Sequence, residues 1–136
     1  YKGRSLVVSG DTVPCRSLKK QSQGVDMLFH EAQQPNMIKM IHDQAGLSSS
    51  PSLAKITADI PSYHTSPEDA AKTANDAGVR HLVLYHILPP LPPVLKSMFL
   101  GDSEKYYNGP ITLAVDGLLI SLPANSNKIS MKQILK

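Results

Sequence analysis

The chain has 136 residues, a formal net charge of +3, 41% hydrophobic residues and 18% charged residues, which is typical of one compact domain or part of one. This composition excludes a charge-driven disordered chain, and His86 or prolines interrupt the longest apolar stretches before they could cross a bilayer. The one cysteine, Cys15, excludes an internal disulfide framework and a multi-cysteine zinc site, so we predict a reducing, cytoplasmic setting. The basic residues form no run longer than two, which argues against a concentrated surface for nucleic acid. The chain starts at Tyr1 without an initiator Met or a leader-like segment, which favours an internal piece of a longer protein.

Alternating strands and helices are predicted in the first half of the chain. An apolar run closed by Gly10 predicts a buried strand that ends in a sharp turn, and Gly24 and Gly46 each end a helix. The predicted strands are residues 5–9 and 25–30, and the predicted helices are residues 15–23, 36–46 and 52–58. We expect the two later helices to cover the sheet.

The second half predicts a capped helix, a further strand and a terminal hairpin. Ser66, followed by Pro67 and two acidic residues, is a typical helix start, and Gly78 is a typical helix end. A strand is predicted at residues 79–85 and a helix at 94–100, and apolar runs at 111–115 and 118–122 flank Asp116-Gly117 as an antiparallel hairpin. The alternation predicts an α/β fold with a mixed sheet and a terminal β-hairpin.

Polar residues follow the predicted strands, where functional groups of open α/β sheets gather. Asp11 follows the first strand and has the chemistry of a metal ligand, but an Asx turn or a helix-approach cap is the alternative. His86 follows a later strand and has the chemistry of a zinc ligand, but a core histidine with a satisfied ring is the alternative.

A second candidate group combines Glu31, in a His-Glu-Ala run, with His64, in a His-Thr-Ser run. A carboxylate that accepts a ring N–H would fix the tautomer and orientation of a histidine for general acid catalysis. The alternative is that Glu31 caps the following loop and that His64 lies on the surface. Spacing alone leaves both interpretations open.

Motifs that occur in a fixed order along the chain resemble the later motifs of the metallo-β-lactamase superfamily, and most closely those of its ribonuclease Z-like branch. The motifs are Ser9-Gly10-Asp11-Thr12, Phe29-His30-Glu31-Ala32, Tyr63-His64-Thr65-Ser66 and Leu84-Tyr85-His86-Ile87. The resemblance implies that residues 1–123 form the C-terminal half of a four-layer αββα domain and that 124–136 are a weakly specified tail.

The resemblance also implies roles for individual residues. Asp11 is similar to the carboxylate that bridges two Zn²⁺ ions, and His86 is similar to the terminal histidine ligand of the second ion. His64 is similar to the histidine that protonates the leaving oxygen, and Glu31 to the acid that orients it. The full-length protein is then expected to be a zinc-dependent hydrolase, in which two metal ions activate water and stabilise a phosphodiester in transit.

Some features of the family pattern are missing from this chain. The metal-binding run His-x-His-x-Asp-His does not occur, so the dinuclear site is incomplete and the chain alone is expected to be inactive. Gln33 and Tyr85 stand at positions where ribonuclease Z usually has Thr, which leaves a phosphodiesterase, a ribonuclease Z-like enzyme and an arylsulfatase-like ester hydrolase open. A non-catalytic binding or structural module of the same fold is a further alternative.

The partners implied are the missing N-terminal half of the domain and a phosphodiester or other ester substrate. RNA and a second copy of the chain, as a homodimer, are further candidate partners, and no membrane partner is expected.

Overall fold

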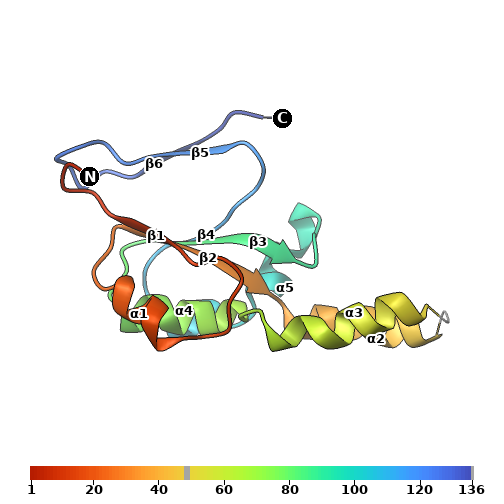
Figure 1. Ribbon diagram of the computed structural model, residues 1–136. Coiled ribbons are helices and arrows are strands. Elements are labelled where there is room, and N and C mark those ends of the chain that lie inside the picture. The colour runs from red at the N-terminus through yellow and green to blue at the C-terminus, as the bar shows by residue number, and fades with distance from the viewer. Residues whose placement is uncertain (48–49, 136) are drawn as a thin grey trace.

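Strands and helices alternate along most of the chain in the computed structural model, which describes residues 1–47 and 50–135 (Figure 1). The strands are β1 (Leu6–Val8), β2 (Met27–Gln33), β3 (Leu82–Leu88), β4 (Ile111–Leu113), β5 (Leu118–Ser121) and β6 (Ser130–Gln133). The α-helices are α1 (Arg16–Gln21), α2 (Pro35–Leu47), α3 (Pro51–Asp59), α4 (Pro67–Asp76), α5 (Lys96–Leu100) and α6 (Ser103–Tyr106), with 3-10 turns η1 (Ile60–Ser62) and η2 (Pro93–Leu95). The predicted α/β class is confirmed.

The first four strands form one parallel sheet in the order β1-β2-β3-β4. Leu28 lies beside Leu82, and Leu82 lies beside Ile111, so an apolar row crosses the sheet. Helices α1 and α4 lie on one face of this sheet (Figure 1), and the alanines of α4 pack on the leucines in the core. Because all four strands run the same way, their carboxyl ends lie at one edge, which positions the candidate site.

Strands β5 and β6 form a separate antiparallel sheet on the opposite side of the parallel sheet from α4 (Figure 1). A terminal β-hairpin is therefore present, but the predicted hairpin across Asp116-Gly117 is wrong, because β4 pairs in parallel with β3 and β5 pairs with β6. The antiparallel strands also lie outside the main sheet, so the single mixed sheet that we predicted is two sheets. Residues 124–136, for which the sequence predicts no element, contribute β6. The domain boundary at residue 123 stays a prediction.

A cluster of charges around the buried Asp26 connects the region after Pro123 to Arg4, which precedes β1. The Arg4 guanidinium lies 3.1 Å from the carboxylate of Asp26, and Arg80 donates to the same carboxylate. Arg4 also donates to the carbonyls of Ser126 at 2.5 Å and Lys128 at 2.8 Å. Burial disfavours the charged carboxylate, but hydrogen bonds from the Ser5 N–H and from Arg4 outweigh it and keep the pKa of Asp26 below its ordinary value.

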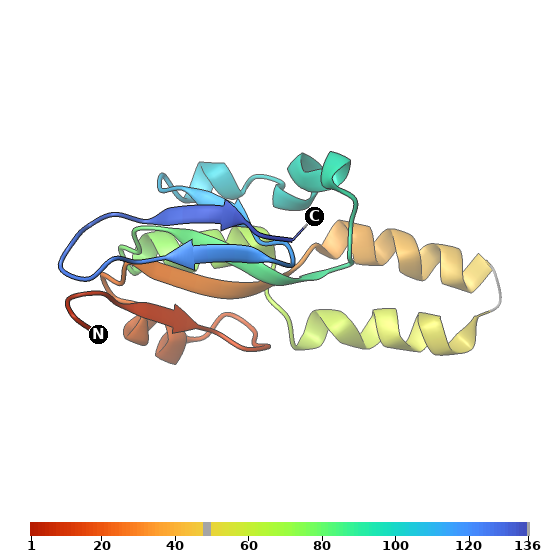
Figure 2. The ribbon, with the colours of Figure 1, turned by 90° about the horizontal axis from the view of Figure 1, so that it is seen from above.

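Helices α2 and α3 pack against each other as an arm that extends beyond the end of the sheet (Figure 2). The prediction that both helices cover the sheet is wrong, since α1 and α4 already occupy that face. Strand β1 also differs from prediction: it is an edge strand, and Leu6 and Val8 are 52% and 55% exposed rather than buried. Within the described residues, none of the helices has the length and apolar character needed to span a bilayer.

Candidate metal centre

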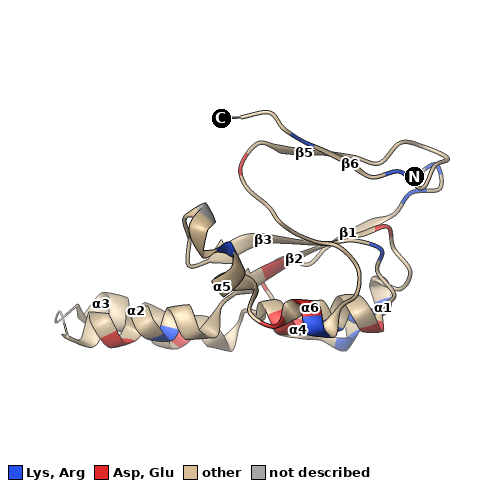
Figure 3. Ribbon diagram, turned by 180° about the vertical axis from the view of Figure 1, so that it is seen from behind, with Lys and Arg blue, Asp and Glu red and all other residues tan. Residues whose placement is uncertain are grey.

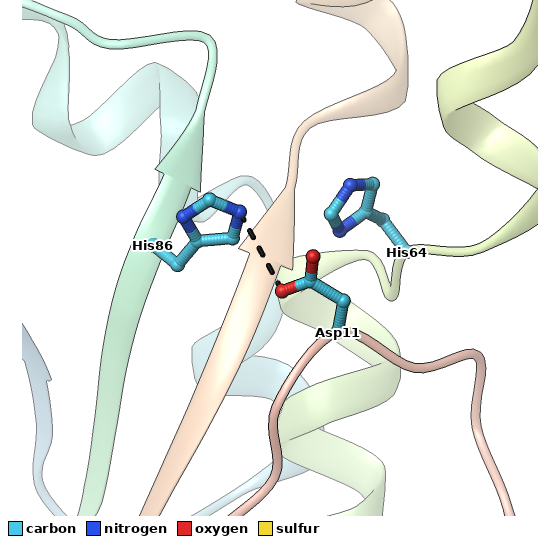
Figure 4. A group of neighbouring side chains, drawn as sticks. All are labelled: Asp11, His64 and His86. Atoms are coloured by element: carbon cyan, nitrogen blue, oxygen red, sulfur yellow. Dashed lines mark ion pairs between the residues drawn. The ribbon is translucent and has the colours of Figure 1, made fainter.

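Side chains from several elements converge at the edge where β1, β2 and β3 end (Figure 4). Asp11 follows β1, His64 precedes α4, and His86 belongs to β3. One ligand atom from each of these residues lies within 4.8 Å of the others. Among residues 1–47 and 50–135 this is the one such group of three or more metal-ligating side chains. The structure therefore brings together Asp11, His64 and His86, which are separated along the sequence.

Asp11 and His86 form an ion-pair contact within this group. Oδ1 of Asp11 lies 3.5 Å from Nε2 of His86, and both side chains are about half exposed, at 57% and 47%. Two ligands of one tetrahedral zinc ion, each about 2.0 Å from the metal, are about 3.3 Å apart. The spacing of these two atoms therefore fits shared coordination of one ion.

A β-bulge in β3 turns the His86 ring toward this edge. Glu31 lies beside Tyr85 and Ala32 beside Ile87, so His86 has no partner on β2. Its φ of 43° lies in the left-handed region, which non-glycine residues adopt rarely. Such a bulge bends the strand and re-aims a side chain. The bulge therefore explains how a residue inside a strand reaches Asp11 across the sheet edge.

Glu31 and His64 form a buried pair beside the exposed one. Oε2 of Glu31 lies 2.8 Å from Nδ1 of His64, and the two side chains are 0% and 3% exposed. The other carboxylate oxygen accepts the Thr65 N–H at 2.8 Å. A carboxylate partner assigns the hydrogen to Nδ1, so Nε2 of His64 is the ring nitrogen left to act at the site. Of the two sequence interpretations, the structure favours the pair over a capping Glu31 and an exposed His64.

The donor set of the site suits a metal ion but is incomplete. Imidazole nitrogen and carboxylate oxygen are donors that zinc prefers, and zinc needs about four ligands in total. The His64 ring centroid lies 5.8 Å from that of His86 with the rings tilted by 43°, so the two imidazoles are direct neighbours at the site. The residues present therefore fit part of a metal centre, in which water or other groups would supply the remaining ligands.

Backbone and hydroxyl groups that the sequence does not single out hold the Asp11 turn in place. The Ser9 hydroxyl accepts the Glu31 N–H at 3.1 Å, and the Thr65 hydroxyl donates to the Thr12 carbonyl at 2.5 Å. The Tyr85 hydroxyl accepts the Gly10 N–H at 3.2 Å. Each of these residues lies inside one of the motifs named above. Membership of a motif is the signal in the sequence that could have identified them as part of the site.

The remaining histidines and Cys15 do not join this group. His30, which was predicted at a strand end, lies within β2 and is fully buried, and burial lowers the pKa of its ring despite a hydrogen bond to the Glu31 carbonyl. His42 contacts Thr57 within the α2–α3 arm, and His81 contacts Thr112. Cys15 lies at the start of α1, where a hydrogen bond with the Ser17 hydroxyl lowers the pKa of its thiol.

Curated relatives of this chain include ribonucleases Z, although no model of a protein family matches the chain. The chain is 33% identical over 114 residues to "Ribonuclease Z" of Mycobacterium tuberculosis strain H37Rv, which covers 84% of this chain and 38% of that protein. It is 39% identical over 93 residues to ribonuclease Z of Mycolicibacterium gilvum, covering 68% of this chain and 29% of that protein. The ribonuclease Z of Myxococcus xanthus is 33% identical over 121 residues, which cover 89% of this chain and 34% of that protein. The chain thus spans less than half the length of these relatives.

Solved structures show the same fold at low sequence identity. The metallo-β-lactamase fold protein YhfI of Bacillus subtilis aligns over 96% of this chain and 41% of its own, with a TM-score of 0.56 and 14% identity. A diphosphatase from the PhnP family aligns over 89% of this chain and 36% of its own, with a TM-score of 0.52 and 18% identity. In both cases the chain matches well under half of the other structure.

Proposed function

This chain has part of the metallo-β-lactamase fold and is homologous to ribonuclease Z, and on that premise we propose that the whole protein is a metal-dependent hydrolase of phosphodiesters. The observation that carries the proposal is the meeting of Asp11, His86 and the buried Glu31–His64 pair at one edge of the sheet. A pair of half-exposed ligands beside a histidine oriented by a carboxylate has the parts that acid-assisted hydrolysis needs.

Asp11 and His86 would hold the metal in this proposal. A bound zinc centre would supply hydroxide at neutral pH and stabilise negative charge on the phosphate. Asp11 has two carboxylate oxygens, of which Oδ1 faces His86, so the other is available for a second ion. The further ligands would come from the part of the domain that this chain does not cover.

His64 would protonate the leaving oxygen from Nε2. Glu31 accepts a hydrogen bond from Nδ1. The proton that His64 would transfer is therefore the one on Nε2, which faces the site. Because Glu31 is fully buried and its other oxygen is held by Thr65, the ring has little freedom to rotate away. The pair would therefore orient the acid before the substrate arrives.

The relatives' names favour a phosphate ester as substrate, since the three relatives reported above are named ribonuclease Z and one similar structure is a diphosphatase. RNA is a narrower expectation with less support from the surface. Figure 3 shows acidic and basic residues interspersed over the helices. Several lysines of the described helices pair with carboxylates, as in Lys39–Asp43 and Lys55–Asp59, which reduces the free positive charge that could bind a phosphate backbone. We therefore propose the phosphodiester class and leave RNA as one arm of the test.

The chain by itself is proposed to be inactive, because its ligand set is incomplete, and a cytoplasmic setting remains our expectation. The test uses the whole protein, with metal content measured by mass spectrometry. Activity is measured on a chromogenic phosphodiester, an aryl sulfate and a precursor transfer RNA. We expect phosphodiester hydrolysis that a chelator abolishes and Zn²⁺ restores.

Asp11→Ala should lose both metal and activity, while Asp59→Ala, on the α2–α3 arm, should keep both. Hydrolysis of the aryl sulfate alone would contradict the phosphodiester proposal and favour an arylsulfatase-like enzyme. A whole protein that binds no metal and hydrolyses none of the substrates would be a binding or structural module instead.

A further inference from the structure

Two neighbouring contacts join the turn after β1 to strand β3. The Gly10 N–H donates to the Tyr85 hydroxyl at 3.2 Å, and Asp11 Oδ1 lies 3.5 Å from His86 Nε2. The contacts thus link consecutive residues on one segment to consecutive residues on the other. Strand β2 lies between the two segments, so Tyr85 reaches across it.

The bulge in β3 is what allows consecutive residues to face the same turn. In a regular strand, neighbouring side chains point to opposite faces of the sheet. Tyr85 is still in register with Glu31, but His86 is the unpaired residue with a φ of 43°, so alternation stops there. Tyr85 can therefore support the turn while His86 contacts Asp11.

The position of Asp11 depends on its backbone, because the one side-chain contact found for it among the described residues is the contact with His86. Hydrogen bonds anchor the turn on several sides. Ser9 N–H donates to the Phe29 carbonyl of β2, and the Thr12 carbonyl accepts from Thr65. Of the anchors of this turn, the Tyr85 hydroxyl is the one that comes from β3, the strand that carries His86.

We propose that Tyr85 is a positioning residue that sets the spacing between Asp11 and His86 through the Gly10 N–H, an inference that rests on the metal-dependent function proposed above. The hydroxyl touches neither ligand and acts on Asp11 through the backbone. A wider spacing lowers the affinity of this pair for metal, since two ligands of one ion must lie about 3.3 Å apart. Tyr85→Phe should therefore weaken Zn²⁺ binding roughly 10-fold, as is typical when support for a metal ligand is lost.

The experiment measures the Zn²⁺ affinity of the whole protein by competition with a chromogenic chelator. Tyr85→Phe keeps the ring and removes the hydroxyl, and Tyr106→Phe, an exposed tyrosine of α6, is the matched control. Amide hydrogen exchange of Gly10 is measured in the same proteins. We expect faster Gly10 exchange and weaker Zn²⁺ binding in Tyr85→Phe, with both unchanged in Tyr106→Phe.

Asp11→Asn, alone and combined with Tyr85→Phe, distinguishes a role through Asp11 from a role elsewhere. If Tyr85 acts through Asp11, the double variant binds Zn²⁺ no more than about twofold more weakly than Asp11→Asn alone. Additive losses would overturn the proposal, and so would Zn²⁺ affinity in Tyr85→Phe within about twofold of wild type. A Tyr85→Phe protein that melts far below Tyr106→Phe would make Tyr85 a general fold residue and would also overturn it.

A wild-type protein that binds no Zn²⁺ would overturn both this inference and the proposed function. Normal Zn²⁺ binding in wild type and in Tyr85→Phe would overturn the inference alone.

Discussion

At the scale of single residues, the buried carboxylate of Glu31 determines what His64 can do. Both of its oxygens are occupied, one by the His64 ring and the other by the Thr65 N–H. Removing either partner of a buried pair leaves a polar group without its hydrogen bond, which is costlier than loss of a surface contact. The pair therefore couples the orientation of the His64 ring to the packing around Glu31.

If the whole protein is the proposed hydrolase, His64→Ala should lower its turnover by roughly 10²-fold or more while metal content stays at the wild-type value. The reason is that the proposed proton donor is lost while the proposed ligands Asp11 and His86 remain. Glu31→Gln should cause a weaker defect of the same kind, because the ring is still present but less well oriented. Turnover and bound metal are measured together on each variant.

His64 belongs to the same group of potential ligands as Asp11, so the metal content of His64→Ala distinguishes a ligand from a proton donor. If His64→Ala loses as much metal as Asp11→Ala, His64 is a metal ligand and not the acid. Unchanged turnover in Glu31→Gln would remove Glu31 from the mechanism.

His30 predicts a pH dependence of stability. Burial holds the pKa of the His30 ring below its ordinary value in the folded chain, whereas in the unfolded chain the pKa of this ring is about 6.5. The unfolded state then binds more protons below this pH, so the free energy of unfolding should fall as the pH decreases from about 7.5 to 5.5. One such group contributes at most about 1.4 kcal/mol per pH unit.

The measurement is urea unfolding of the metal-free whole protein at several pH values. His30→Gln should flatten the dependence, and His81→Gln should flatten it further, since burial also lowers the pKa of His81. A His30→Gln protein with the wild-type slope would show that His30 is not the source.

The resemblance of the motifs to those of a known family predicts which of these residues meet, whereas their spacing alone leaves this open. Asp11, Glu31, His64 and His86 are all present in recognisable runs. The hydrogen bond of Glu31 spans 33 positions in sequence, and that of Tyr85 to Gly10 spans 75. Such contacts depend on strand order and on the bulge at His86, and neither is encoded in local spacing.

At the scale of elements, local signals predict where helices begin better than where strands pair. Asp116-Gly117 does form a turn, in which the Leu118 N–H donates to the Val115 carbonyl. The chain nevertheless continues into a second layer, because β4 is already paired with β3 in the parallel sheet. A two-residue turn signal cannot report that a strand before it has a partner far away in the sequence.

The start of α4 offers a matched test of local signals. Ser66 and Ser50 each precede a proline at the start of a helix, but only the Ser66 side chain accepts a hydrogen bond, from the Asp69 N–H at 3.1 Å. Ser66→Ala should therefore lower the free energy of unfolding by about 1 kcal/mol, and Ser50→Ala by clearly less. Chemical denaturation of both variants checks this, and equal losses would contradict the role of the Ser66 cap.

At the scale of the whole molecule, the two faces of the parallel sheet are covered unequally. Helix α4 packs on one face, while the β5–β6 sheet lies over part of the other and β1 remains at its edge (Figure 2). Leu6 and Val8 are exposed there in the structure of this chain. Relatives that are more than twice as long as the aligned segment have further chain to place against such a face.

We expect these exposed side chains to be buried in the whole protein. Ile56 of the α2–α3 arm is 54% exposed, close to the 55% of Val8, so it is a matched apolar control. If the rest of the domain packs on the β1 edge, Leu6→Gln and Val8→Gln each lose the burial of an aliphatic side chain. Each should then lower the free energy of unfolding by about 1.5–3 kcal/mol. Ile56→Gln, if it stays at the surface, should change it by no more than about 0.5 kcal/mol. Chemical denaturation of the whole protein measures all three, and small, equal effects would show that the β1 edge faces solvent in the whole protein as well.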